Sequence, residues 1–219
     1  MSKTALVIGA SGQDGAYLSR LLLDKGYAVH ATSRDAEAAS LFALKSLGLH
    51  ERLTMHSMSP HDFHSVLQVL EAAEPAEIYN LSGQSSVALS FTQPAATIES
   101  IVDSTLNILE AIRVLGGGMR FYNAGSSECF GDTGRHPANE LTAFRPRSPY
   151  GIAKSAAVSL VTNYRESYSM FACSGLLFNH ESPLRPQRFV TRKIAIAAAS
   201  IANGIGHRLA LGNLSIHRD

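Results

Sequence analysis

The sequence is poor in cysteine, in net charge and in long apolar runs, and each shortage excludes a class of protein. Its only cysteines are Cys129 and Cys173, too few for a disulfide framework, so a reducing cytosol is expected. Lys and Arg total 19 against 18 Asp and Glu, a formal net charge of +1, which gives no general attraction to nucleic acid or a membrane surface. No apolar stretch is long enough to span a membrane and no signal-peptide pattern is present. We therefore expect a cytoplasmic protein without nucleic-acid or membrane partners.

Histidine is more frequent, with nine residues, but the spacing of a metal site is absent. Neither H-x-x-x-H nor C-x-x-C occurs, and these spacings are typical of zinc sites. We interpret His56, His61 and His64 as surface and helix-start residues and predict no metal.

Apolar runs and helical patterns alternate along the 219 residues, which suffice for one large buried core. Near-continuous apolar strands that alternate with helices indicate a parallel sheet covered on both faces. The fold class is therefore α/β, with a doubly wound parallel sheet whose sites lie at the carboxyl ends of its strands. The expected strands are 4–8, 27–32, 53–58, 77–81, 119–124 and 171–178, and the expected helices are 14–24, 37–47, 62–73, 94–115, 148–168 and 191–202.

A glycine-rich loop with the spacing G-x-x-G-x-x-G follows the first expected strand and opens the first expected helix. Glycines there permit a tight turn and leave the helix N-terminus free to meet a pyrophosphate. A glycine-rich turn without a ligand is the alternative, but the order of strand, loop and helix favours dinucleotide binding. The candidate cofactor residues of this loop are Gly9, Ser11, Gly12, Gln13, Asp14 and Gly15.

The end of the second expected strand bears on which dinucleotide is bound. An NAD site usually has a carboxylate there, which holds the ribose 2′-hydroxyl. This chain has Arg34, with no acid before it, and an arginine favours the 2′-phosphate of NADP. Asp35 follows directly and could neutralise Arg34, so NAD stays open as the alternative.

A tyrosine and a lysine four residues apart open the helix expected at 148–168. Tyr150 and Lys154 then lie on one helix face, one turn apart, and a nearby ammonium favours the phenolate. Tyr150 is therefore a candidate base for an alcohol proton. Glu128, two residues after Ser126, offers a second acid/base group, and two bases suggest two proton transfers. The alternative for Glu128 is an ordinary loop or capping carboxylate.

Five blocks of sequence resemble the extended short-chain dehydrogenase/reductase family and, within it, the GDP-mannose 4,6-dehydratases. They are GASGQDGAY at 9–17, EIYNLSGQSSV at 77–87, AGSSECFG at 124–131, SPYGIAK at 148–154 and FNHESPLRPQRFVTRKI at 178–194. The resemblance implies dehydration of GDP-mannose with NADP as cofactor, and a homodimer or homotetramer. A nucleotide-sugar 4-reductase or 4-epimerase, or a non-catalytic cofactor-binding protein, remains an alternative.

The same resemblance implies roles for individual residues. Ser126, Glu128, Tyr150 and Lys154 take the catalytic positions, and the last two also contact the cofactor. Leu81 and Arg34 take further cofactor positions. The implied substrate-binding residues are Ser85, Ser126, Asn179, Val190, Lys193 and Arg218.

The resemblance also divides the chain. Residues 1–178 are expected to form the NADP-binding domain with the Tyr/Lys helix, and 179–219 to begin the substrate-binding region. The family continues well beyond this point, so most of the small C-terminal substrate lobe is expected to be absent. A fragment and a naturally truncated protein are both open, and we expect little turnover from the 219 residues alone.

Overall fold

The computed structural model describes residues 2–37, 40–116, 118–134, 136–206, 208–212 and 214. The chain divides into two compact units, Met1–Leu177 and Phe178–Asp219. The first unit contains the sheet, and the described part of the second contains the helix α8 (Val190–Ala202).

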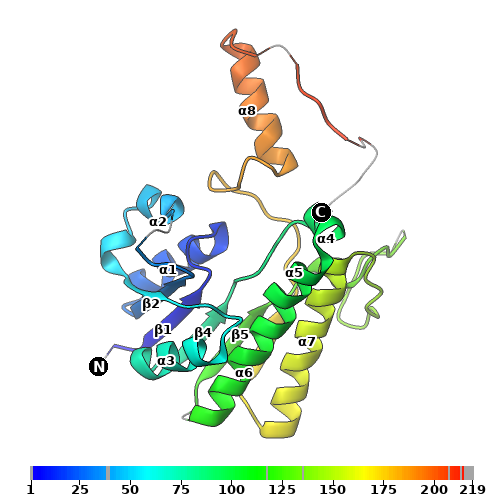
Figure 1. The fold of residues 1–219 in the computed structure, drawn as a ribbon. Coiled ribbons are helices and arrows are strands. Elements are labelled where there is room, and N and C mark those ends of the chain that lie inside the picture. The colour runs from blue at the N-terminus through cyan, green and yellow to red at the C-terminus, as the bar shows by residue number, and fades with distance from the viewer. Residues whose placement is uncertain are drawn as a thin grey trace. The chain divides into compact units, whose positions relative to one another are not determined.

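The first unit is built on a six-stranded parallel sheet with the order β3-β2-β1-β4-β5-β6 (Figure 1). The order reverses between β1 and β4, which is the switch point where doubly wound folds bind their ligands. The predicted fold class is confirmed. The strands are β1 (Thr4–Ile8), β2 (Ala28–Ser33), β3 (Thr54–Ser57), β4 (Glu77–Asn80), β5 (Arg120–Ala124) and β6 (Ala172–Gly175).

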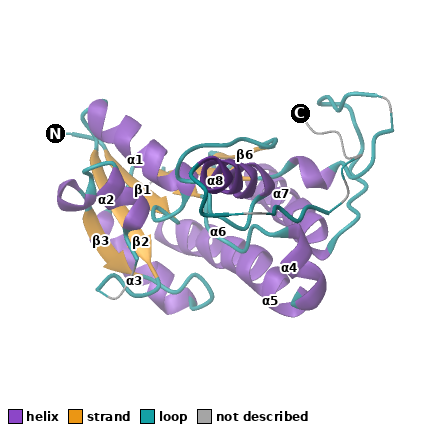
Figure 2. Ribbon diagram, turned by 90° about the horizontal axis from the view of Figure 1, so that it is seen from above, coloured by secondary structure: helices purple, strands orange, loops and turns teal. Residues whose placement is uncertain are grey.

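Helices cover both faces of this sheet. Figure 2 shows α1 on the opposite side of the strands from α3 and α6, while α3, α6 and α7 pack side by side. The helices of the first unit are α1 (Gln13–Asp24), α2 (Phe42–Ser46), α3 (Phe63–Ala73), α4 (Val87–Thr92), α5 (Pro94–Ile98), α6 (Ser104–Leu115) and α7 (Pro149–Tyr168). Short 3₁₀ turns occur at His50–Arg52 and Ser127–Cys129, and a π-helical turn at Glu99–Asp103.

The main core lies between the sheet and the face formed by α3, α6 and α7. Its strand residues are fully buried, and burying a large apolar side chain stabilises a fold by about 1.5–3 kcal/mol. This packing keeps the strand ends, which carry the site, on a rigid base. The core includes Leu6, Ile8, Ile78 and Phe121 from the strands and Val66, Leu70, Ile108, Leu109 and Val161 from the helices.

The helix predicted at 37–47 was largely wrong, since α2 covers only Phe42–Ser46. The chain before it forms a turn, because the carboxylate of Asp35 accepts a hydrogen bond from the Glu37 N–H at 3.0 Å. Such a side-chain bond competes with helix formation. Residues 38 and 39 lie outside the described residues.

The helix predicted at 94–115 is real but interrupted. The π-helical turn Glu99–Asp103 separates α5 from α6, and α4 precedes them as a helix that was not predicted. Ser86 caps α4, where its hydroxyl accepts a hydrogen bond from Leu89 N–H at 3.3 Å.

Candidate active site

The glycine loop and the end of β4 meet at the carboxyl edge of the sheet. Gly9 has a φ of +87°, and a Cβ there would lie 3.0 Å from the backbone of Leu81. A Cβ on Gly15 would lie 2.4 Å from the Gly9 carbonyl oxygen. Only glycine fits these two positions, so the loop keeps its backbone open to a ligand.

The first turn of α1 completes this cradle. Gly12 is its N-cap and offers no side chain to cap the helix, while Gly12 N–H donates to the Gly9 carbonyl at 3.1 Å. The start of a helix favours an anion, because its N–H groups and its dipole both point toward the ligand. The shape and polarity of this loop therefore fit the pyrophosphate of a dinucleotide.

Arg34 follows β2 directly, and its side chain is exposed. The neighbouring Asp35 bonds through one carboxylate oxygen to the Glu37 N–H, so this oxygen is turned toward its own backbone. Arg34 and Asp35 thus stand together at the position where a ribose 2′-substituent is read in this type of fold.

The Ser126–Glu128 turn follows β5 and is anchored to the neighbouring strand end. The Gly125 N–H donates to Gly175 and the Ser127 N–H to Leu177, both at 2.8 Å. The Ser126 hydroxyl then accepts a hydrogen bond from Glu128 N–H at 3.2 Å. These bonds set the backbone of Glu128 beside the edge of the sheet.

Helix α7 starts against this turn. Ser148 caps it, with its hydroxyl accepting from Gly151 N–H at 3.0 Å, and Pro149 is the first helical residue. A Cβ on Gly151 would lie only 2.7 Å from the carbonyl oxygen of Glu128. The helix that carries Tyr150 therefore touches the turn that carries Glu128. Sequence reasoning missed Gly151, although a glycine in the first turn of a helix was a signal.

Lys154 is buried one turn further along α7. Its ammonium donates to the Ala124 carbonyl at 2.8 Å and lies 5.9 Å from the centroid of the Tyr150 ring. Burial lowers the pKa of Lys154 to about 8, and nearby Cys129 opposes this shift. Cys129 is fully buried, as expected for a small packed residue.

Tyr150 is also mostly buried, and it packs with Ile101, Ala153 and Ala157. The arrangement brings a phenol, an ammonium and the Glu128 turn to one edge of the sheet. Such a set can remove a proton from an alcohol and exchange a second proton through a carboxylate.

The remaining predicted residues are divided between the two units. Ser85 is exposed in the loop after β4. Asn179 and Val190 are exposed in the second unit, where Lys193 donates to the Ala210 carbonyl at 2.6 Å. Arg218 lies outside the described residues.

The family model of GDP-mannose 4,6 dehydratase matches residues 6–219. The chain belongs to this family. A GDP-mannose 4,6-dehydratase of Sinorhizobium fredii is 46% identical over 99% of this chain and 64% of its own length. One of Vibrio cholerae is 43% identical over 100% of this chain and 61% of its own length. The chain thus spans about three fifths of these dehydratases.

Solved structures agree with the fold. A dTDP-glucose 4,6-dehydratase from Streptomyces venezuelae with NAD bound has a TM-score of 0.80 at 19% identity, covering 92% of this chain and 62% of its own. A UDP-glucose 4-epimerase from Thermus thermophilus with NAD has a TM-score of 0.78 at 23% identity, covering 92% and 63%. At these identities the likeness shows the fold alone.

No group of three or more His, Cys, Asp or Glu side chains in the described part of the chain is arranged to hold a metal ion. No described helix combines the length and apolar character needed to cross a bilayer.

Proposed function

We propose that this chain carries the catalytic machinery of a GDP-mannose 4,6-dehydratase, which converts GDP-D-mannose to GDP-4-dehydro-6-deoxy-D-mannose and water. The observation that carries the proposal is the contact between Gly151 and the Glu128 carbonyl. This contact joins the helix that carries Tyr150 and Lys154 to the turn that carries Glu128. Oxidation of an alcohol needs only the Tyr/Lys pair, whereas loss of water also needs a carboxylate such as Glu128.

NADP is the proposed cofactor, held by residues 1–178. The glycine cradle fits a pyrophosphate, and the exposed Arg34 supports recognition of a 2′-phosphate. Leu81 would lie beside the cofactor, because its backbone closes over Gly9. When bound, the dinucleotide supplies a hydride acceptor that later gives the hydride back to the same sugar.

The first proton transfer belongs to Tyr150. Its phenolate takes the proton of the sugar C4 hydroxyl, and Lys154 stabilises the phenolate by its charge. Ser126 donates a hydrogen bond to the C4 oxygen. Oxidation at C4 acidifies the adjacent C5 hydrogen, which prepares the second step.

The second proton transfer belongs to Glu128. Its carboxylate takes the C5 proton and delivers a proton to the C6 hydroxyl, which leaves as water. The hydride that was removed at C4 ends at C6, and C5 takes up a proton in the same step, which is balanced by the proton that Tyr150 removed from the C4 hydroxyl. One site therefore needs both a Tyr/Lys pair and a carboxylate, and no other base is required.

The substrate-binding residues are proposed from the family's motif positions in this sequence. Ser85 would contact the sugar side, and 179–219 would supply the start of the nucleotide side through Asn179, Val190, Lys193 and Arg218. The protein would act in the cytoplasm as a homodimer or homotetramer. Exposed apolar side chains on neighbouring helices, among them Leu106 and Ile152, support such an assembly.

The test is a product assay with GDP-mannose and NADP⁺. Two proteins are compared: the chain itself, and the chain fused to the part of the Sinorhizobium fredii relative that the similarity does not cover. The 4-keto product from either protein supports the proposal, provided that the matching Glu128→Gln variant makes none. Cofactor binding without product in both proteins would overturn it. Consumption of NADPH with a keto substrate would indicate a reductase instead.

A further inference from the structure

The loop of residues 81–86 links the cofactor cradle to the catalytic helix. At its start, Leu81 closes over Gly9, with only 3.0 Å between the Leu81 backbone and the position of a Gly9 Cβ. At its end, Val87 packs against the buried cluster that contains Tyr150, Ala153 and Ala157. A shift of this loop would therefore move both ends of the candidate site.

The side chain of Gln84 organises the middle of this loop. Its amide nitrogen donates to the Ser86 carbonyl at 2.9 Å and to the Thr97 hydroxyl at 3.1 Å. Its amide oxygen accepts a hydrogen bond from the Ser86 N–H. Both donors of the amide are thus used inside the protein. Gln84 therefore acts on other residues of the chain and not directly on a ligand.

The partners of Gln84 lie at the irregular part of the long helical segment. Thr97 is fully buried in α5, and its hydroxyl also donates to the Gln93 carbonyl at 2.8 Å. Ser100, in the π-helical turn, accepts a hydrogen bond from the Gln84 N–H at 3.3 Å. These bonds attach the loop to two successive turns of one helical segment.

The π-helical turn in turn contacts the catalytic helix. Gly83 has a φ of +109°, and a Cβ there would lie 3.0 Å from the side chain of Ile101. Ile101 is buried against Tyr150. A π turn inserts one residue into a helix and is frequent at functional sites. Here it brings Ile101 between the loop and Tyr150.

We propose that Gln84 is a positioning residue, which holds the 81–86 loop so that Ser85 and Tyr150 keep a fixed relative placement. The proposal deepens the proposed function and rests on it, because Ser85 is taken to contact the sugar. Gln84 touches neither sugar nor cofactor. Its side-chain amide holds the backbone N–H and carbonyl of Ser86, the residue after Ser85, and bonds to the Thr97 hydroxyl. Its backbone N–H bonds to Ser100 and so attaches the residue before Ser85 to the π-helical turn.

The first measurement is hydrogen exchange of the whole chain, which needs no activity. In Gln84→Ala the amides of 81–87 should exchange about tenfold faster than in the wild type, because the side-chain bonds of Gln84 to Ser86 and Thr97 are lost. Thr97→Val removes one acceptor with little change of shape and should give a smaller increase, whereas Thr97→Ser keeps the hydroxyl and should match the wild type. Gln68→Ala, at an exposed position of α3, is the control.

The second measurement is turnover in the protein that makes product, with kcat expressed per cofactor-binding site titrated by calorimetry. Gln84→Ala should lower this kcat by about 100-fold, the size of effect expected when reacting groups shift by roughly 1 Å. It should also raise the KM for GDP-mannose. A merely unstable variant would lose binding sites without changing kcat per site.

The outcomes separate this proposal from the function on which it rests. Unchanged exchange at 81–87 in Gln84→Ala overturns the positioning role, whatever the activity. Faster exchange with unchanged kcat per site also overturns it. Absence of product from the wild type refutes the dehydratase function, and the exchange result then still decides whether Gln84 holds the loop.

Discussion

The backbone of Gly151 faces the carbonyl oxygen of Glu128 so closely that a Cβ would lie 2.7 Å away. The two residues belong to separate elements, the first turn of α7 and the 3₁₀ turn after β5. Their contact determines how near the helix that carries Tyr150 approaches the second acid/base residue. Gly151 has no functional side chain, yet its contact sets the distance between the helix that carries Tyr150 and the turn that carries Glu128.

Replacing Gly151 by alanine tests this relationship. Inside a helix the change should stabilise the protein by about 1 kcal/mol, because alanine has the better helix propensity. Here the Cβ meets a backbone oxygen, and such overpacking costs about 1–3 kcal/mol. We expect a net loss of stability in urea denaturation and a fall in turnover.

The control is Gly212→Ala, because a Cβ on Gly212 has no neighbour within 4 Å. It should leave both stability and turnover unchanged. If Gly151→Ala has wild-type stability and turnover, the contact does not set the site.

Two isosteric substitutions separate the proposed bases. Glu128→Gln cannot accept a proton, so oxidation at C4 should proceed while loss of water stops. Reduced cofactor should then accumulate and be visible by its absorbance. Tyr150→Phe should prevent the first oxidation, so no reduced cofactor forms. Calorimetry should show that Glu128→Gln still binds cofactor, and product formation by Glu128→Gln would rule it out as the C5 base.

Short-range patterns predicted the framework of this protein well. Apolar runs marked the strands, and Ser148 with Pro149 marked the start of α7 at the observed position. These features depend on residues close in sequence, so the sequence contains their signal. The prediction of a helix at 37–47 was largely wrong because the Asp35 carboxylate bonds to the backbone N–H of Glu37 at its start. The spacing of apolar residues gives no information on such a side-chain bond.

Long-range contacts explain most of what was missed at the site. Glu128 and Gly151 meet only because the 3₁₀ turn after β5 packs against α7, and Gln84 reaches Thr97 across the whole of α4. The π-helical turn has no sequence pattern of its own. It contains Ile101, which contacts both the Gly83 loop and Tyr150.

Cofactor preference should depend on Arg34. The wild type is expected to bind NADP more tightly than NAD, since a guanidinium pairs with a 2′-phosphate. Arg34→Ala should weaken NADP binding about tenfold or more and leave NAD binding nearly unchanged. Calorimetric titration with both dinucleotides measures this, with Arg52→Ala, another exposed arginine, as control. Equal affinities in the wild type would contradict the assignment.

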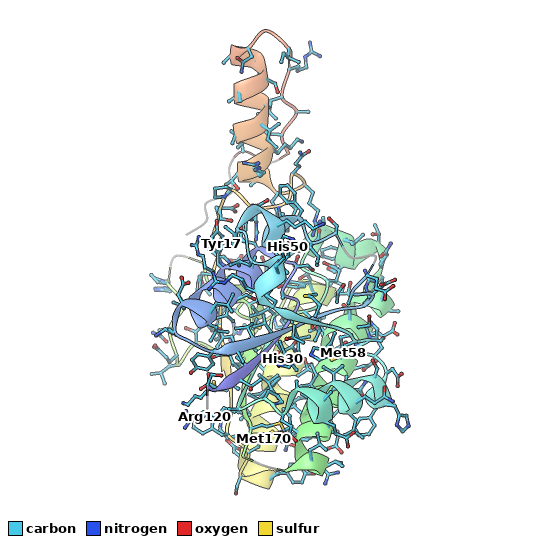
Figure 3. All side chains as sticks on the ribbon, turned by 90° about the vertical axis from the view of Figure 1, so that its left-hand side faces the viewer. Tyr17, His30, His50, Met58, Arg120 and Met170 are labelled. Carbon is cyan, nitrogen blue, oxygen red and sulfur yellow. The ribbon has the colours of Figure 1, made fainter. Side chains whose placement is uncertain are left out.

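Two histidines should make the protein sensitive to acid. His30, labelled in Figure 3, lies on β2, and its Nδ1 is 2.8 Å from Nε2 of His56 on β3. Burial lowers the pKa of both rings, and for His30 the neighbouring His56 adds to the effect. The folded protein therefore binds fewer protons than the unfolded chain, and stability should fall as the pH drops below about 6.5.

Urea midpoints at neutral and acidic pH measure this dependence. His56→Gln should reduce the loss of stability in acid, because one of the two imidazoles whose pKa is lowered by folding has been removed. His64→Gln, at an exposed position of α3, should leave it unchanged. An equal loss in the wild type and His56→Gln would show that the pair is not responsible.

Burial of the Lys154 ammonium beside Tyr150 should lower the stability of the folded protein. Its pKa is lowered from 10.5 to about 8, chiefly by burial, so the folded state disfavours the charged form. Lys154→Met should therefore stabilise the protein at neutral pH by about 1–2 kcal/mol, even though Ala124 loses a donor. Turnover should be lost. The exposed Lys45→Met should change neither property.

The sign of the pH dependence follows from the same shift. Below pH 8 the lysine is protonated in both states and the full cost of burying its charge is felt. Between about 8 and 10.5 the folded protein has released this proton while the unfolded chain still holds it, so wild-type stability should rise with pH relative to Lys154→Met. Denaturation at pH 7 and near pH 9.5 compares the two proteins. A difference that does not change with pH would mean that the folded and unfolded states bind this proton equally, so that burial does not lower the pKa of Lys154.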